Sequence, residues 1–392
     1  MKPILLTTAI CLTMVCRAIA EPNVGLDHFD IPSEHRAEPI ATIWSPAKRK
    51  TYAALVGDSS SQVAAVEFSA GVQQIVAHSQ ERGTDLDVTV WYPASPGGEA
   101  ALLGESVFFK GTESMRNAPI STGRFPLILL SHGAGLAGRA EAMSWIATAL
   151  AKEGFIVAAP THPGNTGPDR SAAETMKLWL RPSDLSETLD AIARNRILQP
   201  YLNSERVGVL GLSMGGNTAL SIAGALFDPE LLANYCDTND LNASLCDWVR
   251  LSGVDLHAMN MELASRDNRD ERIGFVMSID PAPVDVFAVE SFSRISVPVA
   301  LINLGKEGEI PLTAQAMNIA KTIPDANYEV IEDAGHFSMF AECKPGAAEI
   351  ALQGGIEDPI CTDGNGDSRE AIHAQLINMI VAAFNRALKQ GH

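Results

Sequence analysis

The sequence predicts a fold of the α/β class, in which a mostly parallel sheet is covered by helices on both faces. Short β-prone apolar runs alternate with amphipathic helical stretches from about residue 86 onward, and this alternation is typical of parallel sheets. Hydrophobic residues make up 46% of the 392-residue chain and charged residues 19%, as in globular proteins. A chain of this length can enclose one large, well-buried core.

The expected strands and helices follow in chain order. Each strand is a short apolar run, at residues 87–93, 125–132, 155–162, 206–213, 273–280, 297–305 and 328–335. Helices are expected over 141–154 and 182–195, the second capped by Ser183 or Asp184. A last helix, over about 368–389, carries an apolar stripe that predicts packing against the sheet.

Two insertions interrupt this alternation, at residues 224–271 and 341–367. Both follow elements at the sheet edge that carries catalytic loops, so we expect them to form a cap over a site. Residues 363–367 resemble half of a calcium loop, but Ser368 and Ala374 stand where that loop needs Gly and Glu. We therefore interpret this stretch as a turn that caps the last helix.

The first twenty residues are typical of a secretory leader. Lys2 supplies the positive charge, residues 4–16 an apolar run, and residues 18–20 an Ala-x-Ala cleavage site. The run is too short to span a membrane, so we expect an exported protein, periplasmic or secreted, without an integral span. Loss of Lys2 and Arg17 would take the net charge from −18 to −20, which argues against nucleic acid and anionic membranes as partners.

Two of the six cysteines lie in the leader, and four remain. An even number in an exported chain predicts two disulfides, and the sequence alone allows three connectivities. We expect the local pairings Cys236–Cys246 and Cys343–Cys361, which close short loops. Neither Cys-x-x-Cys nor clustered histidines accompany them, so we expect no metal.

An internal repeat joins the N-terminal region to the predicted sheet. Residues 41–60 match residues 88–107 at a constant offset of 47, with nine of twenty positions identical. We interpret the repeat as a duplicated β-hairpin. Its first copy then lies in a separate segment, residues 21–84, and its second begins the main domain, residues 85–392. We expect the first copy to extend the sheet edge or to cover the mouth of a pocket.

The candidate nucleophile is Ser213, in the Gly-x-Ser-x-Gly sequence of residues 211–215. An apolar strand precedes this turn and a helix follows it, which is the setting of a nucleophile elbow. Glycine is needed on either side because the chain turns too sharply there for a side chain. The helix also directs its positive N-terminal end toward the serine.

A second loop, Ser131 to Gly135, follows an apolar strand and has the His-Gly-x-Gly pattern that supplies one oxyanion-hole donor in such sites. We expect that donor to be the N–H of Ala134, and the other to be the N–H of Met214. His132 is expected to hold the loop.

The candidate general base is His336, in an Ala-Gly-His-Phe sequence after the last strand. His162 also ends a strand at this edge and is a candidate to line the pocket. The remaining histidines are expected to be solvated or structural: His28, His35, His78, His257, His373 and His392.

The triad acid has two candidate locations. Glu307 and Glu309 follow the strand over 297–305, whereas Asp280 ends the strand before it. We favour Asp280 because a strand end holds a carboxylate more firmly than a glycine-containing loop, at the sheet edge that carries sites.

Five spaced motifs then resemble one known group: SHGAG, APTHPGN, RPSD, GLSMGGNTAL and AGHF. In this order they resemble the exported branch of the dienelactone-hydrolase-like α/β-hydrolases, which are related to plasma platelet-activating-factor acetylhydrolase. The resemblance covers about residues 85–390 and implies a serine carboxylic-ester hydrolase without metal or organic cofactor. It also supports Asp280 as the acid. Dienelactone hydrolases proper use cysteine where this chain has Ser213, so their chemistry is not implied.

Other functions stay open at this point. A peptidase, a polyester depolymerase or a lipase-like enzyme would carry the same motifs, because the insertions set the substrate. A non-catalytic binding module on the same fold is a further alternative. The sequence leaves the oligomeric state, the ester and its acyl chain length undetermined.

Overall fold

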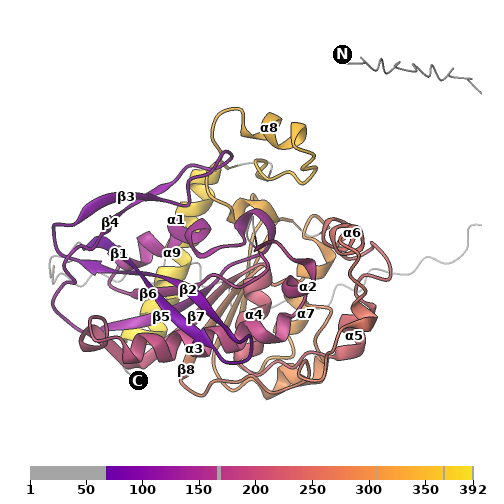
Figure 1. Cartoon of the computed structure of the whole chain (residues 1–392), viewed down its shortest axis with the longest axis horizontal. Coiled ribbons are helices and arrows are strands. Elements are labelled where there is room, and N and C mark those ends of the chain that lie inside the picture. The colour runs from indigo at the N-terminus through magenta and orange to yellow at the C-terminus, as the bar shows by residue number, and fades with distance from the viewer. Residues whose placement is uncertain (1–67, 166–168, 307, 365–366, 391–392) are drawn as a thin grey trace, which may run out of the picture. The chain divides into compact units, whose positions relative to one another are not determined.

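A ten-stranded sheet runs through the part of the chain that the computed structural model describes, residues 68–165, 169–306, 308–364 and 367–390 (Figure 1). Its strands lie in the order β10-β9-β8-β7-β5-β6-β2-β1-β4-β3. All neighbours from β10 to β6 are parallel, and antiparallel pairs join β6 to β2, β2 to β1 and β4 to β3. This confirms the predicted fold class. The strands are β1 (Ser69–Ser79), β2 (Thr84–Ala94), β3 (Glu99–Leu103), β4 (Thr112–Arg116), β5 (Phe125–Ser131), β6 (Ile156–Pro160), β7 (Leu202–Leu212), β8 (Ile273–Ile279), β9 (Val299–Leu304) and β10 (Ala326–Ile331).

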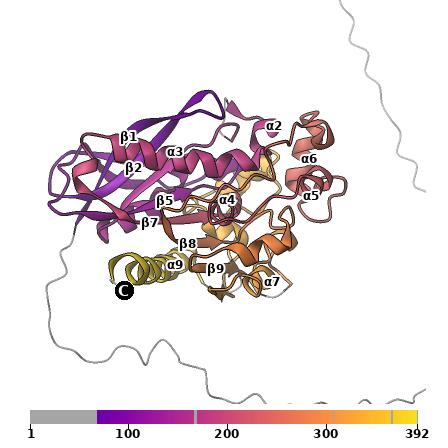
Figure 2. The ribbon, with the colours of Figure 1, turned by 90° about the horizontal axis from the view of Figure 1, so that it is seen from below.

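Helices cover both faces of the sheet, as Figure 2 shows for α3 and α9. They are α1 (Ser144–Lys152), α2 (Ala172–Thr175), α3 (Arg181–Arg194), α4 (Met214–Ile222), α5 (Pro229–Asn234), α6 (Ala243–Leu251), α7 (Met317–Ala320), α8 (Ala347–Gln353) and α9 (Arg369–Phe384). One turn of π-helix, Asn385–Lys389, extends α9.

The core has two halves because side chains alternate across the sheet. Leu127 and Leu129 of β5 pack on the side of α3 and α4, whereas Ile128 and Leu130 pack on the side of α1 and α9. The central strands are therefore apolar on both faces, as their continuous hydrophobic runs predict. Among the described residues, no helix is long and apolar enough to cross a membrane.

The hairpin interpretation of the repeat is wrong for the copy that the structure describes. Its strands β2 and β3 do not pair with each other, because β1 and β4 lie between them. The real hairpin is β1 with β2, paired over their full length from Ser69 opposite Ala94 to Ser79 opposite Thr84. The sheet thus begins at β1, before the predicted boundary at residue 85. The first copy, residues 41–60, lies outside the described residues.

The predicted cap of the helix at 182–195 is also wrong. The helix begins at Arg181, with Pro182 in its first turn and no side-chain cap. Asp184 therefore lies inside the helix and is fully buried. Its carboxylate does not cap the helix, because it contacts Arg82, which follows β1, and His162, which follows β6.

Candidate active site

Ser213 lies between the end of β7 and the start of α4, with φ 53° and ψ −120°. This left-handed backbone is strained for a side-chain-bearing residue and is typical of a nucleophile elbow. A Cβ at Gly211 would collide with the carbonyl of Gly215, and one at Gly215 with the carbonyl of Ser131. The two glycines therefore allow the close approach of β5, β7 and α4 that exposes the serine.

The backbone carbonyl of Ser213 is held by three N–H groups. It accepts from Gly216 at 2.8 Å, from Ala282 at 3.0 Å and from Asn217 at 3.2 Å. The C=O and N–H of a trans peptide point in opposite directions, so these bonds fix the direction of the Met214 N–H. As the first residue of α4, Met214 has no intrahelical acceptor for that N–H.

His336 lies within hydrogen-bonding distance of both Ser213 and Asp280. Its Nε2 is 3.2 Å from Ser213 Oγ, and its Nδ1 is 2.9 Å from Asp280 Oδ2. With the proton on Nδ1, the ring donates to the carboxylate and its Nε2 accepts from the serine hydroxyl. This is the relation of nucleophile, base and orienting acid found in serine hydrolases.

Asp280 is fully buried at the end of β8. Its Oδ1 accepts from Asn303 Nδ2 at 2.7 Å and from the backbone N–H of Leu304 at 2.8 Å, both on neighbouring β9. The carboxylate is thus held by two donors besides His336. Of the alternative acids, Glu309 is exposed and Glu307 lies outside the described residues.

The loop that carries His336 is held by residues of the C-terminal segment. Ser338 Oγ accepts from the N–H of Gly335 and donates to Asp363 at 2.7 Å. Asp363 also accepts from the buried Arg369 of α9 at 2.8 Å. His373 Nε2 donates to the carbonyl of Ser338 at 2.9 Å, and burial lowers its pKa to about 4, so it is neutral.

The loop after β5 passes directly over the nucleophile. A Cβ placed on Gly133 would lie 3.4 Å from Ser213 Cβ and 3.8 Å from its Oγ. Ala134 follows in an extended conformation, with φ −112°. The loop is therefore close enough to offer a second backbone donor to an atom bound at Ser213.

His162, the candidate for lining the pocket, is instead fully buried behind this loop. Its Nδ1 donates to Asp184 at 2.7 Å, and its Nε2 accepts from Ser131 Oγ at 3.0 Å. Burial, followed by the charges of Arg181 and Arg82, lowers the pKa of His162 well below its usual value. The structure thus holds a second Ser–His–Asp array, which sequence reasoning missed.

A cavity of about 640 Å³ begins one residue beyond Ala134, at Gly135 and Leu136. Phe109 and Phe340 lie in its wall with ring centres 5.6 Å apart. Phe337 joins this wall to the site, because its ring centre is 5.5 Å from Phe340 and 5.6 Å from His336. Neither Ser213 nor His336 lines the cavity itself. A row of edge-to-face rings leads from His336 to it.

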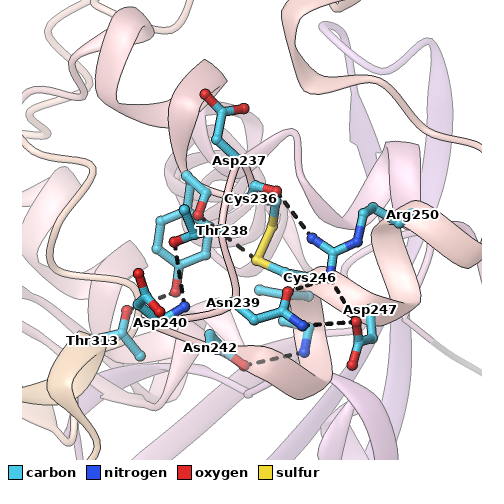
Figure 3. Close-up of a disulfide and its surroundings, with 12 residues drawn as sticks. Cys236, Asp237, Thr238, Asn239, Asp240, Asn242, Cys246, Asp247, Arg250 and Thr313 are labelled. Carbon is cyan, nitrogen blue, oxygen red and sulfur yellow. Dashed lines mark hydrogen bonds and ion pairs between the residues drawn. A yellow bond between two sulfur atoms is a disulfide. The ribbon is translucent and has the colours of Figure 1, made fainter.

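The structure contains both expected disulfides. Cys343–Cys361 has a Cα separation of 5.7 Å and lies beside the cavity wall, because Cys343 forms a β-bridge with Phe109. Cys236–Cys246 lies in the first insertion, where Arg250 donates to the carbonyl of Cys236 at 3.2 Å (Figure 3). Apart from Ala341, neither insertion lines the cavity, so a cap over the site stays a prediction.

Comparisons with known proteins support the fold. Residues 127–348 match the model of a family described as the alpha/beta hydrolase family. The structure is similar to a ferulic acid esterase from Streptomyces cinnamoneus, with a TM-score of 0.53 and 17% identity over 84% of this chain and 92% of that one. A putative dipeptidyl aminopeptidase IV from Bacteroides ovatus matches at a TM-score of 0.45 and 12% identity, over 82% of this chain and 36% of that one. No curated protein sequence matches significantly. At 17% identity, the match to the ferulic acid esterase establishes the fold alone.

Proposed function

Because the chain belongs to the alpha/beta hydrolase family, we propose that it is an exported serine carboxylic-ester hydrolase. The hydrogen-bonded series from Ser213 through His336 to Asp280 carries the proposal. A binding module would have no need of an elbow serine in a strained conformation, facing a base that is itself held by a buried carboxylate.

The proposed reaction passes through an acyl-enzyme. Ser213 Oγ attacks the ester carbonyl carbon while His336 Nε2 takes the hydroxyl proton. The N–H groups of Met214 and Ala134 stabilise the oxyanion, and His336 then protonates the leaving alcohol. Water, deprotonated by the same histidine, attacks the acyl carbon and restores Ser213. Asp280 holds the ring in the required tautomer throughout.

The cavity supports a small-molecule ester as the substrate. Its volume of about 640 Å³ lies within the range of small-ligand pockets, roughly 300–1,000 Å³. Its aromatic wall, Phe109 and Phe340, favours an apolar or aryl group on one side of the ester.

Two observations support export. The first twenty residues have the pattern of a secretory leader. The two disulfides would be stable in an oxidising compartment and rare in the cytosol.

A panel of p-nitrophenyl esters, from acetate to long acyl chains and to benzoate, tests the proposal. We expect the wild-type protein to hydrolyse esters of this panel. The rate should fall by several orders of magnitude in Ser213→Ala. Ser221→Ala is a matched control, because this buried serine of α4 has an Oγ without a hydrogen-bond partner among the described residues. It should keep wild-type rates. Equal rates in the wild type and Ser213→Ala would refute the proposal.

A further inference from the structure

Five buried polar side chains lie behind the loop that passes over Ser213. They are Ser131, His132, His162, Arg181 and Asp184, each at most 1% exposed, and we name them the bracing network. Burial of polar and charged groups costs free energy unless they are bonded. The bonds that they make therefore show which parts of the fold they hold.

One end of the network holds the peptide that carries the Ala134 N–H. His132 Nδ1 donates to the carbonyl oxygen of Gly133 at 2.7 Å. That carbonyl belongs to the same peptide as the Ala134 N–H and points the opposite way. The bond therefore sets the direction of this N–H. His132 Nε2 in turn accepts from the backbone N–H of His162 at 3.0 Å.

The second Ser–His–Asp array holds His162 from behind. Its ring lies between Ser131 Oγ and Asp184 Oδ2, at 3.0 and 2.7 Å. Asp184 is itself paired with Arg82 at 2.8 Å. Ser131 is fully buried, so substrate does not reach this array. We infer that it fixes a ring and a loop instead of reacting.

Arg181 joins this loop to the start of α4. Its Nη2 donates to the carbonyl of His132, and its Nε donates to Thr218 Oγ1 at 3.0 Å. Thr218 Oγ1 donates onward to the carbonyl of Met214 at 3.0 Å. One planar guanidinium thus reaches both backbone segments that carry the two proposed oxyanion donors. Lysine could not hold both, because it lacks the fixed fork of donors.

We propose that the bracing network is a positioning device for the oxyanion hole, in which Arg181, through Thr218, ties the His132–Gly133 peptide to the Met214–Gly215 peptide. Each of these two peptides directly adjoins a peptide that carries a proposed oxyanion donor. This inference rests on the proposed esterase function, since those peptides matter only if an oxyanion forms at Ser213. An oxyanion hole whose two N–H donors are less firmly positioned would bind the transition state more weakly. It would leave binding of the substrate itself unchanged.

A matched pair of threonines tests the proposal. Thr218 and Thr188 are both fully buried in helices, and each donates its Oγ1 to the carbonyl four residues earlier, at 3.0 and 2.7 Å. Thr218 alone of the pair accepts from Arg181, whereas Thr188 contacts only the backbone carbonyl of Asp184 and not the carboxylate that holds His162. Thr218→Val and Thr188→Val thus remove the same helix bond, but only the first breaks the link to the oxyanion segments.

We expect Thr218→Val to lower kcat roughly tenfold, a fraction of the 10²–10³-fold loss caused by removing a donor outright. KM should stay within about twofold. The inhibition constant of an alkyl trifluoromethyl ketone should rise by the factor by which kcat/KM falls. Ser213 Oγ bonds to the carbonyl carbon of this probe, the serine proton passes to His336, and the carbonyl oxygen becomes an oxyanion in the hole. Thr188→Val should match the wild type in all three measurements.

Arg181→Lys gives a second test, with an expected fall in kcat of roughly a hundredfold and the same rise in the ketone constant. Circular dichroism should first show that Thr218→Val and Thr188→Val are both folded. The positioning role is overturned if the two variants then have the same kcat and the same inhibition constant for the ketone. It is also overturned if Thr218→Val raises KM and leaves kcat unchanged. A wild type without activity on any ester would instead overturn the proposed function and, with it, this role.

Discussion

Replacing Asp280 with asparagine changes one atom of the site and tests how the acid acts. The carboxylate accepts at Oδ1 from Asn303 and Leu304, and at Oδ2 from His336. An asparagine must keep its oxygen toward the first two donors, because its NH₂ would otherwise face two N–H groups. Its NH₂ then faces His336 Nδ1.

This orientation reverses the histidine tautomer. With an N–H donor opposite it, Nδ1 becomes the acceptor and the ring proton moves to Nε2, the atom 3.2 Å from Ser213 Oγ. A protonated Nε2 cannot take the serine proton. The corresponding change in a serine protease costs about 10⁴-fold in kcat, which is about 5.5 kcal/mol of transition-state stabilisation. We expect a loss of the same order here, with KM nearly unchanged.

The assay is the pre-steady-state release of p-nitrophenol from a short ester, which separates acylation from turnover. Asp280→Asn should slow the burst, whereas Glu309→Gln, an exposed residue, should leave it unchanged. An Asp280→Asn enzyme that keeps a tenth of the wild-type burst rate would refute the role of this acid. If Glu309→Gln slowed the burst more than Asp280→Asn, the triad acid would instead be Glu309, in the loop after β9.

Three further predictions concern the fold around the site. Replacing both Cys343 and Cys361 with serine removes a crosslink over 18 residues and should cost about 3 kcal/mol, seen as a lower Tm. Gly215→Ala should prevent folding or strongly destabilise the protein, since its Cβ collides with backbone, whereas Gly274→Ala meets only an ordinary contact; similar urea midpoints would contradict this. Burial lowers the pKa of His373 to about 4, so the unfolded chain binds a proton that the folded protein does not between about pH 6.5 and 4. The resulting loss of stability, about 2 kcal/mol from pH 7 to pH 5, should disappear in His373→Phe when unfolding is followed in urea.

The elements that local pattern determines were predictable from the sequence. The strands β5, β6, β8 and β9 are nearly continuous apolar runs and are mostly buried on both faces, as is the second half of β7 from Val207 onward. The turn at Ser213 was also predictable, because its strand, its two glycines and its helix are contiguous in the chain. Asp280 could be ranked above the glutamates because a strand end constrains a side chain in a way that a loop does not.

What the sequence could not supply depends on residues that meet only in the folded chain. β1 contains two glutamines and alternates only weakly, so its place in the sheet follows from its pairing with β2. Arg181 and Asp184 resemble polar residues at an exposed helix start. They are buried because Arg82 and His132 arrive beside them from distant segments. The RPSD motif was the available signal, but its residue types alone do not show what they contact.

The most direct test of the account asks which serine reacts. The structure holds two Ser–His–Asp arrays, centred on Ser213 and on Ser131. The protein should be treated with a fluorophosphonate, and the adduct located by peptide mass spectrometry. We expect a single adduct on Ser213, absent from Ser213→Ala, because Ser213 is partly exposed at its elbow whereas Ser131 is fully buried. An adduct on Ser131, or undiminished labelling of Ser213→Ala, would contradict it.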